Sequence, residues 1–261
     1  MTSPIRAKKH LGQHFLNDEN IAKKIVDALL ECNNNLPVIE VGPGTGVLTK
    51  YLIPELKNNF YALDVDRDSV PYLKEHYPEA AGQIYLADFL EFDISTIING
   101  KYNVIGNFPY NISSQIMFKV LENRNHVDCV VGMFQKEVAQ RIAEKPGSKV
   151  YGILSVFLQA FYDIEYLFTV NENAFTPPPK VKSAVIRLKR NERKALSCNE
   201  ELFIKIIKAT FNQRRKTIRN SIRAVVNIPD EELIPLFQKR PEQLSVEQFI
   251  ELTEFVEGKT K

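Results

Sequence analysis

Short apolar runs alternate with longer segments of mixed polarity through the first 190 residues of the chain. The short runs predict buried strands, and apolar residues three and four positions apart predict helices between them. Alternation of strands with helices is typical of a doubly wound, mostly parallel sheet, so we predict an α/β fold. The predicted strands are 37–41, 60–63, 83–86, 102–106, 127–133, 164–170 and 183–188, and the predicted helices include 18–31, 47–56, 112–121 and 151–161.

The pattern changes after Arg190. Strand-like runs stop there, and only helical periodicity continues, from Glu200 to about Phe255. We therefore expect two domains: residues 1–190, which contain the sheet, and residues 191–261, which form a small all-α domain.

The first half of the helical region is strongly basic. Seven Lys or Arg and no acid occur between Lys205 and Arg223. Residues at four-residue steps share one helix face, so Arg215, Arg219 and Arg223 predict a basic stripe. A solvated face usually mixes charges, whereas an acid-free stripe favours contacts with phosphate. The candidate RNA-binding residues are Arg214, Arg215, Lys216 and Arg219.

The overall composition is that of an ordinary globular protein, and the net charge does not indicate a partner. The 261 residues are 44% hydrophobic and 25% charged, with a formal net charge of +2. Cys32, Cys129 and Cys198 have no pairing or metal-ligand spacing, which indicates a reducing compartment. His10 and His14 lack a third ligand, so no metal is expected. No apolar run is long enough for a membrane span. We expect a soluble, cytoplasmic monomer with no membrane contact.

A glycine-rich turn, Gly42-Pro43-Gly44-Thr45-Gly46, follows the first predicted strand. Glycines there allow a sharp turn and let a ligand approach the backbone closely. The signal is weak alone, because many strand–helix turns contain glycine. Asp64 ends the next strand about twenty residues later, where a carboxylate can accept hydrogen bonds from both hydroxyls of a ribose. We interpret Asp66 and Asp68 as solvated or helix-capping residues.

Two further positions allow a structural or a functional interpretation. Asp88 follows the third strand and can accept from an adenine amino group beside Phe89, or it can cap a short turn. Phe175 precedes three prolines, which stiffen the loop. It can form one wall of a base pocket, or it can be an ordinary packed aromatic.

The stretch with the most specific chemistry is Asn107-Phe108-Pro109-Tyr110, after the strand at 102–106. Open parallel sheets place their chemistry at the carboxyl ends of strands. The Asn107 side-chain oxygen and the Phe108 carbonyl are two acceptors that suit an amino group with two hydrogens, such as N6 of adenine. Tyr110 offers a face on which a base can stack. The alternative is a tight turn with a packed tyrosine.

Together these motifs resemble the small-subunit (16S) ribosomal RNA adenine N6,N6-dimethyltransferase family, nearly end to end. The resemblance implies a Rossmann-like S-adenosylmethionine-dependent methyltransferase sheet with a small all-α C-terminal domain. It also implies a substrate of two adjacent adenosines in the 3′-terminal hairpin loop of 16S rRNA within the small ribosomal subunit, and a role in late subunit assembly. The segments that carry it are Gly12 to Asp18, Glu40 to Gly44, Asn107 to Tyr110, Phe175 to Ser183 and Phe211 to Ser221.

The resemblance also assigns roles by position. The catalytic loop is Asn107, Phe108, Pro109 and Tyr110, and the implied cofactor contacts are His14, Leu16, Gly42, Gly44, Asp64, Asp88 and Asn107. His14 and Leu16 would act through their backbone. The chain departs from the family at two positions, since the family commonly has Leu where Phe108 stands and Asn where His14 stands.

Three alternative functions stay open at this point. The first is the related class that methylates adenine N6 in large-subunit rRNA. The second is an assembly factor whose binding matters more than its catalysis. The third is a nucleotide-dependent oxidoreductase, which only the sheet and Asp64 favour.

Overall fold

The computed structural model describes residues 5–229 and 234–260 and divides the chain into two compact units. The first unit contains the chain up to Ala139 and Asp163–Arg190, and the second contains Gln140–Tyr162 and the chain from Asn191 onward. We predicted that 140–162 belongs with the sheet. It belongs instead to the helical unit, because α6 (Ile153–Gln159) packs its apolar side chains against helices of that unit.

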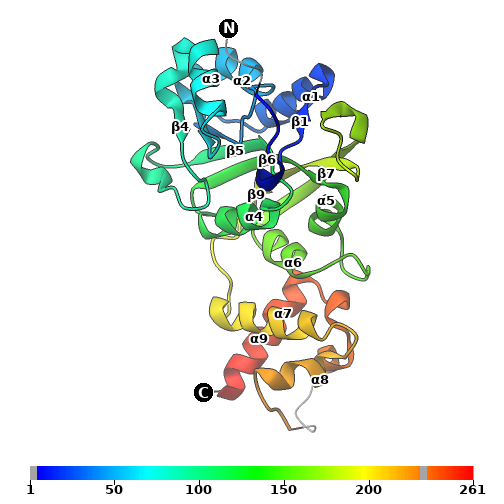
Figure 1. The fold of residues 1–261 in the computed structure, drawn as a ribbon. Coiled ribbons are helices and arrows are strands. Elements are labelled where there is room, and N and C mark those ends of the chain that lie inside the picture. The colour runs from blue at the N-terminus through cyan, green and yellow to red at the C-terminus, as the bar shows by residue number, and fades with distance from the viewer. Residues whose placement is uncertain (1–4, 230–233, 261) are drawn as a thin grey trace. The chain divides into compact units, whose positions relative to one another are not determined.

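A seven-stranded sheet with the order β4-β3-β2-β5-β6-β9-β7 forms the core of the first unit (Figure 1). Strands β2 to β6 run parallel in their pairs, and β9 pairs antiparallel with β6. The predicted doubly wound, mostly parallel sheet is confirmed. The bounds are β2 Val38–Val41, β3 Phe60–Asp64, β4 Ile84–Leu86, β5 Tyr102–Asn107, β6 Val127–Gln135, β7 Tyr162–Val170 and β9 Ser183–Arg190.

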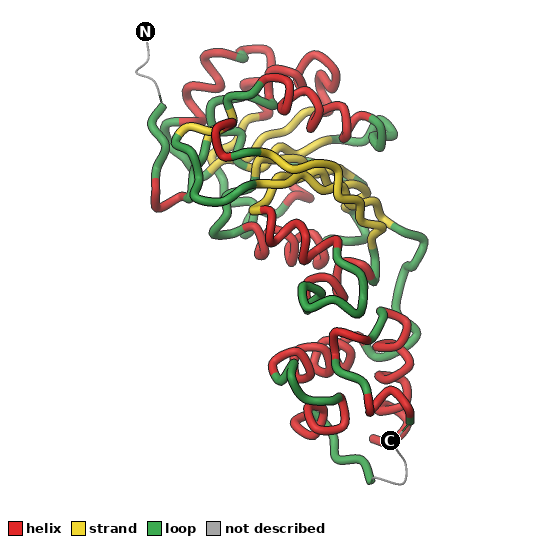
Figure 2. Tube along the Cα trace, turned by 90° about the vertical axis from the view of Figure 1, so that its right-hand side faces the viewer, coloured by secondary structure: helices red, strands yellow, loops and turns green. Residues whose placement is uncertain are grey.

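Helices lie on both faces of this sheet (Figure 2). In the first unit, α1 (Glu19–Leu30), α2 (Thr49–Leu56) and α3 (Ser69–His76) lie on one face and α4 (Ser113–Glu122) on the other (Figure 1). The side chain of Asp18 accepts hydrogen bonds from the N–H groups of Asn20 and Ile21, so it caps α1 as its sequence position predicts. Helix α5 (Lys136–Ala143) follows β6 directly.

The N-terminal segment is held across the sheet's carboxyl edge by a separate two-stranded ladder. Strand β1 (Phe15–Leu16) pairs antiparallel with β8 (Phe175–Thr176), and Leu16 lies opposite Phe175. Both side chains are buried in the core. The packed-aromatic interpretation of Phe175 is therefore the correct one, and its ring is not a wall of the candidate site.

The second unit contains α6, α7 (Glu200–Asn212), α8 (Ile218–Ser221) and α9 (Val246–Thr260). The predicted basic stripe on one helix is wrong, because α7 ends at Asn212 and a turn separates it from α8. Arg215 lies in that turn, whereas Arg219 lies in α8. The helical periodicity therefore does not continue through these arginines.

A disulfide joins Cys32, just after α1, to Cys129 in β6, with the two Cα atoms 6.7 Å apart. The expectation of unpaired cysteines is wrong. The two residues lie 97 positions apart, and they meet because α1 packs on β6. Spacing along the chain carries no signal of that contact.

No helix within the described parts of the chain is long and apolar enough to span a membrane.

Candidate active site

A cavity of about 190 Å³ opens at the carboxyl edge of the parallel strands. Its walls come from the ends of β2, β3 and β5, from the residues after β4, and from the N-terminal segment Leu11–Phe15. Parallel strands bring these ends together, as the topology predicts. Among the residues predicted from sequence, His14, Gly42, Gly44, Asp64, Asp88 and the loop Asn107–Tyr110 all line the cavity.

The glycine turn closes one end of the cavity through left-handed backbone that favours glycine. Gly42 and Gly44 have φ values of 67° and 57°. A Cβ at Gly44 would lie 2.9 Å from a ring carbon of Phe15, so a side chain at that position would collide with the N-terminal segment. The turn therefore keeps bare backbone against the cavity.

Asp64 lies beside this turn and is only 5% exposed. Its two carboxylate oxygens accept hydrogen bonds from the N–H groups of Gly44 (3.1 Å) and Asp66 (2.8 Å). Burial raises the pKa of Asp64, and these backbone donors partly oppose that shift. Each oxygen keeps a second lone pair, so the carboxylate can still accept from ligand hydroxyls.

Asp88 has the predicted structural role and also lies at the cavity. Its Oδ1 accepts from the N–H of Leu90 at 2.9 Å, so it does cap a short turn. The same residue lines the cavity beside Phe89, which is buried. The cavity therefore has apolar wall residues together with two carboxylates, those of Asp64 and Asp88.

Asn107 ends β5 at the cavity and is oriented by main chain. Its Nδ2 donates to the backbone carbonyl of His14 at 2.8 Å. A carbonyl only accepts, so the amide nitrogen must face it. The side-chain oxygen therefore remains as the acceptor that Asn107 offers to a ligand in the cavity.

Phe108 is almost fully buried, at 1% exposed, and its ring meets Phe134 edge-on with centroids 5.2 Å apart. A Cβ at Gly132 would lie 2.2 Å from this ring, and one at Gly106 would lie 2.7 Å from it. Gly106 and Gly132 thus leave space for the Phe108 ring. The Phe108 residue itself is part of the loop that lines the cavity.

Tyr110 is held on two sides. Its hydroxyl pairs with Ser183 Oγ at 2.5 Å, and its ring stacks on His14 with centroids 5.4 Å apart and planes 28° apart. Burial raises the pKa of the Tyr110 hydroxyl. His14 Nδ1 lies 2.8 Å from the carbonyl of Pro177, so Nδ1 carries a proton and donates. His14 therefore contributes its carbonyl to Asn107 and its ring to Tyr110.

Leu16, a predicted cofactor contact, does not line the main cavity. Its side chain is buried in the core, and the residue borders a smaller adjoining cavity together with Phe15, Glu40 and Asn107. Glu40 is 1% exposed and accepts from Thr49 Oγ1 at 2.6 Å, and burial raises its pKa to about 8.

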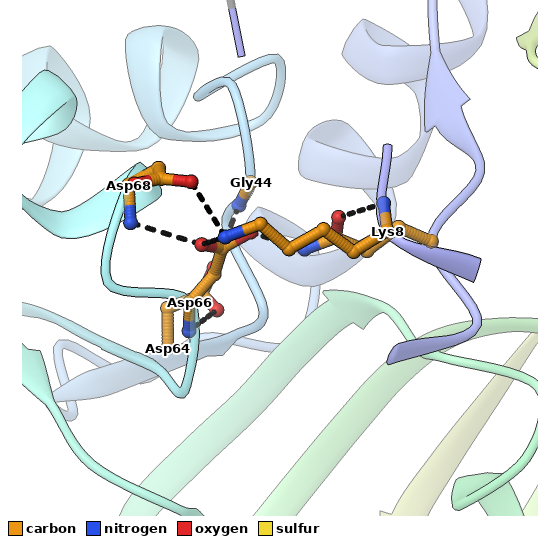
Figure 3. Close-up of polar contacts among 6 residues, drawn as sticks. Lys8, Gly44, Asp64, Asp66 and Asp68 are labelled. Carbon is orange, nitrogen blue, oxygen red and sulfur yellow. Dashed lines mark hydrogen bonds and ion pairs between the residues drawn. The ribbon is translucent and has the colours of Figure 1, made fainter. Parts of the chain in front are cut away.

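Three residues beside the site were missed at the sequence level. Asp66 is 1% exposed, so it is not solvated, but its Oδ1 accepts from the N–H of Asp68 at 2.9 Å just before α3. Asp68 is solvated, as predicted, with its side chain 67% exposed. The Asp66 carboxylate accepts from Lys8 Nζ of the N-terminal segment (Figure 3). It also accepts from Gln13 Nε2 of the same segment. No pattern along the chain signals this contact, because Lys8 and Asp66 lie 58 positions apart.

The predicted RNA-binding residues of the second unit differ in their surroundings. Arg214 Nη2 donates to the carbonyl of Tyr151 at 3.0 Å, so this guanidinium stabilises its own unit. Arg215 and Lys216 are exposed, and Arg219 is half-buried. Arg215 and Lys216 are therefore the most accessible of these four predicted residues. Across the two described stretches, no cluster of His, Cys, Asp or Glu could hold a metal ion.

Comparison with known proteins decides between the families that fit this site. The sequence model of the family described as ribosomal RNA adenine dimethylase matches residues 5–256. The chain belongs to that family. The protein named "Ribosomal RNA small subunit methyltransferase A" from Parabacteroides distasonis is 55% identical to this dimethylase-family chain over 251 residues, which is 95% of this chain and 93% of the relative.

Two further comparisons extend the dimethylase family resemblance. The protein of the same name from Cytophaga hutchinsonii is 55% identical over 98% of this chain and 99% of its own length. A crystal structure of a dimethyladenosine transferase from Plasmodium falciparum superposes with a TM-score of 0.82 at 26% identity, over 95% of this chain and 98% of that one. The predicted α/β methyltransferase fold is confirmed.

Proposed function

We propose that this protein transfers methyl groups from S-adenosylmethionine to N6 of two adjacent adenosines in the 3′-terminal hairpin loop of small-subunit rRNA. The family and the relatives named as small-subunit methyltransferases support the substrate class. The single observation that carries the proposal is the hydrogen bond from Asn107 Nδ2 to the His14 carbonyl, which leaves the amide oxygen of this cavity-lining residue free to accept from a ligand.

The cavity fits the donor. Asp64 would accept from the ribose hydroxyls, Asp88 from the adenine amine, and the backbone of the turn at Gly42 and Gly44 would lie close to the ligand. When bound, S-adenosylmethionine supplies a methyl group on a sulfonium, which is already a good leaving group. The protein's task is then mainly to position the acceptor amine.

The acceptor amine is a poor nucleophile, because the adenine ring withdraws its lone pair. Hydrogen bonds from both N–H groups to Asn107 Oδ1 and the Phe108 carbonyl favour a pyramidal nitrogen with a localised lone pair. This stabilisation grows toward the transition state, which is what accelerates the reaction. The proton leaves after the methyl group arrives, so no early general base is required.

Tyr110 would stack on the target base, which must leave its own stack to reach the cavity. The Phe175 ring is buried elsewhere, so the second aromatic ring beside Tyr110 is that of His14. The exposed residues Arg215 and Lys216 would bind RNA phosphates. Cytoplasmic location, a monomeric state and a role in late subunit assembly complete the proposal.

The test is to incubate the protein with labelled donor and unmethylated small or large ribosomal subunits, and then to map the modified nucleotides. We expect dimethyladenosine at two adjacent positions of small-subunit rRNA and no label in the large subunit. Label confined to the large subunit would contradict the substrate assignment. Absence of label in both, with intact donor binding, would contradict the activity.

A further inference from the structure

An ion pair fastens the N-terminal segment to the loop after β3. We call residues 8–14 the N-terminal strap. Lys8 Nζ lies 2.5 Å from Asp66 Oδ1 and 2.6 Å from Asp68 Oδ2, and Figure 3 shows it reaching across to both carboxylates. Gln13 Nε2 donates to Asp66 Oδ2 at 2.9 Å, and its Oε1 accepts from the N–H of Lys8 at 2.8 Å.

Asp66 is the anchor of this arrangement. Its side chain is fully buried, whereas that of Asp68 is 67% exposed. Burial alone would raise the pKa of Asp66, but hydrogen bonds from Lys8, the Asp68 N–H and Gln13 outweigh it and lower that pKa. Removing the cation from a buried carboxylate costs much free energy. Asp66 therefore stabilises the strap in the position that keeps Lys8 beside it, which we call the closed position. The exposed pair with Asp68 adds little.

The strap connects two parts of the cavity. One is the part beside Asp64, where we propose that S-adenosylmethionine binds, and the other is the part beside Asn107, where we propose that the adenine amine binds. Asp66 also donates its N–H to Asp64, which in turn accepts from Gly44 in the glycine turn. At the other end of the strap, the carbonyl of His14 accepts from the Asn107 amide.

Between these two ends, Leu11–His14 form part of the cavity wall. Gly12 lies so close to the loop that follows Tyr110 that a Cβ there would meet Asn111 Oδ1 at 2.5 Å. A displaced strap would thus change both the donor site and the orientation of the acceptor amide.

We propose that Lys8 and Gln13, acting through Asp66, are positioning residues for methyl transfer. They hold the N-terminal strap closed, so that the donor pocket is complete and the His14 carbonyl keeps Asn107 in its reactive orientation. This inference rests on the proposed function for the reaction itself, but its donor-binding part stands without RNA.

The first experiment measures binding of labelled S-adenosylmethionine by equilibrium dialysis in the absence of RNA. The variants are Lys8→Met, Lys8→Arg and Asp66→Asn, and the matched control is Lys9→Met, an exposed lysine next to Lys8. We expect Lys8→Met and Asp66→Asn to weaken donor binding by roughly tenfold or more, since small misplacements of a site are costly. Lys8→Arg should recover most of the affinity, and Lys9→Met should match wild type.

The second experiment follows tryptic cleavage of the N-terminal segment in wild type and Asp66→Asn, which carry the same sites at Arg6, Lys8 and Lys9. We expect several-fold faster cleavage in the variant. A third measurement compares kcat and the donor KM, and both should change in Lys8→Met.

The outcomes separate a positioning role from a structural one. A lowered melting temperature with unchanged donor affinity and unchanged cleavage would overturn the proposal, as would equal behaviour of Lys8→Met and Lys9→Met. If wild type binds donor but methylates no rRNA, the proposed function fails while the donor-binding test of the strap still holds.

Discussion

Asn107 Nδ2 donates to the carbonyl of His14 across 2.8 Å, although the two residues lie 93 positions apart. The bond fixes which end of the amide faces main chain, and it leaves the oxygen free to accept from a ligand. Asn107, which the sequence motif predicts to be catalytic, is thus oriented by a main-chain carbonyl. Any residue at position 14 would supply that carbonyl, so its role does not depend on the His14 side chain.

Tyr110 allows its ring and its hydroxyl to be tested separately. Tyr110→Phe removes the hydrogen bond with Ser183 but keeps the stacking face, so we expect methyl transfer within a few-fold of wild type. Tyr110→Ala should weaken substrate binding by roughly tenfold or more, since stacking contributes about 1–3 kcal/mol per base. Steady-state kinetics with small subunits checks both, and equal losses in the two variants would contradict the stacking role.

Gly132 tests the packing beneath the catalytic loop. In Gly132→Ala the new Cβ would lie 2.2 Å from the Phe108 ring, so we expect a loss of about 1–3 kcal/mol in unfolding free energy. Denaturant unfolding measures it. The control is Gly258→Ala in α9, where a Cβ meets nothing within 4 Å and where alanine should stabilise by up to about 1 kcal/mol.

The smaller side chain of Phe108→Leu should return part of the stability in the Gly132→Ala background. Additive losses in the double variant would show that the two sites do not interact.

The sequence predicts the parts of this structure that depend on neighbours along the chain. Strand ends, the glycine turn and Asn107 to Tyr110 follow from local periodicity, and parallel strands bring them to one edge. The Cys32–Cys129 disulfide and the Lys8–Asp66 ion pair could not be predicted, because each needs the tertiary positions of distant segments.

Two of the predictions from sequence are wrong for another reason, namely that local patterns do not show where a helix ends or in which unit it packs. The basic stripe failed because helical periodicity cannot reveal that the chain turns after Asn212. Segment 140–162 was assigned to the sheet domain because it lies between two strands in sequence, whereas its apolar helix packs in the other unit.

Glu40 predicts a specific dependence of stability on pH. Its pKa is raised from 4.5 to about 8 in the folded protein, so the folded state holds a proton that the unfolded state releases. Wild-type stability relative to Glu40→Gln should therefore fall as pH rises from about 4.5 to about 8 and then level off. One pKa unit corresponds to about 1.4 kcal/mol, so the difference should reach a few kcal/mol.

Unfolding free energies of wild type and Glu40→Gln across pH 4 to about 9 measure this difference. Curves that stay parallel throughout that range would contradict the raised pKa of Glu40.

The second unit allows a matched comparison of neighbouring cations. Replacing exposed Arg215 and Lys216 by Gln should weaken rRNA binding and flatten its dependence on salt, by about 1.5 in the logarithmic slope if each contacts one phosphate. Arg214→Gln should instead lower unfolding free energy by about 1–2 kcal/mol, because its guanidinium donates to the carbonyl of Tyr151. Filter-binding titrations at several salt concentrations check the slope, and an unchanged slope would place the RNA elsewhere.

The most direct test of the acceptor role is the rate of methyl transfer by Asn107→Ala, measured in single turnover alongside its affinity for small subunits. Loss of an acceptor that acts mainly in the transition state should lower the rate by roughly a hundredfold or more. Binding of the subunit should change little. A variant that methylates adenine at a near wild-type rate would contradict the role assigned to this amide.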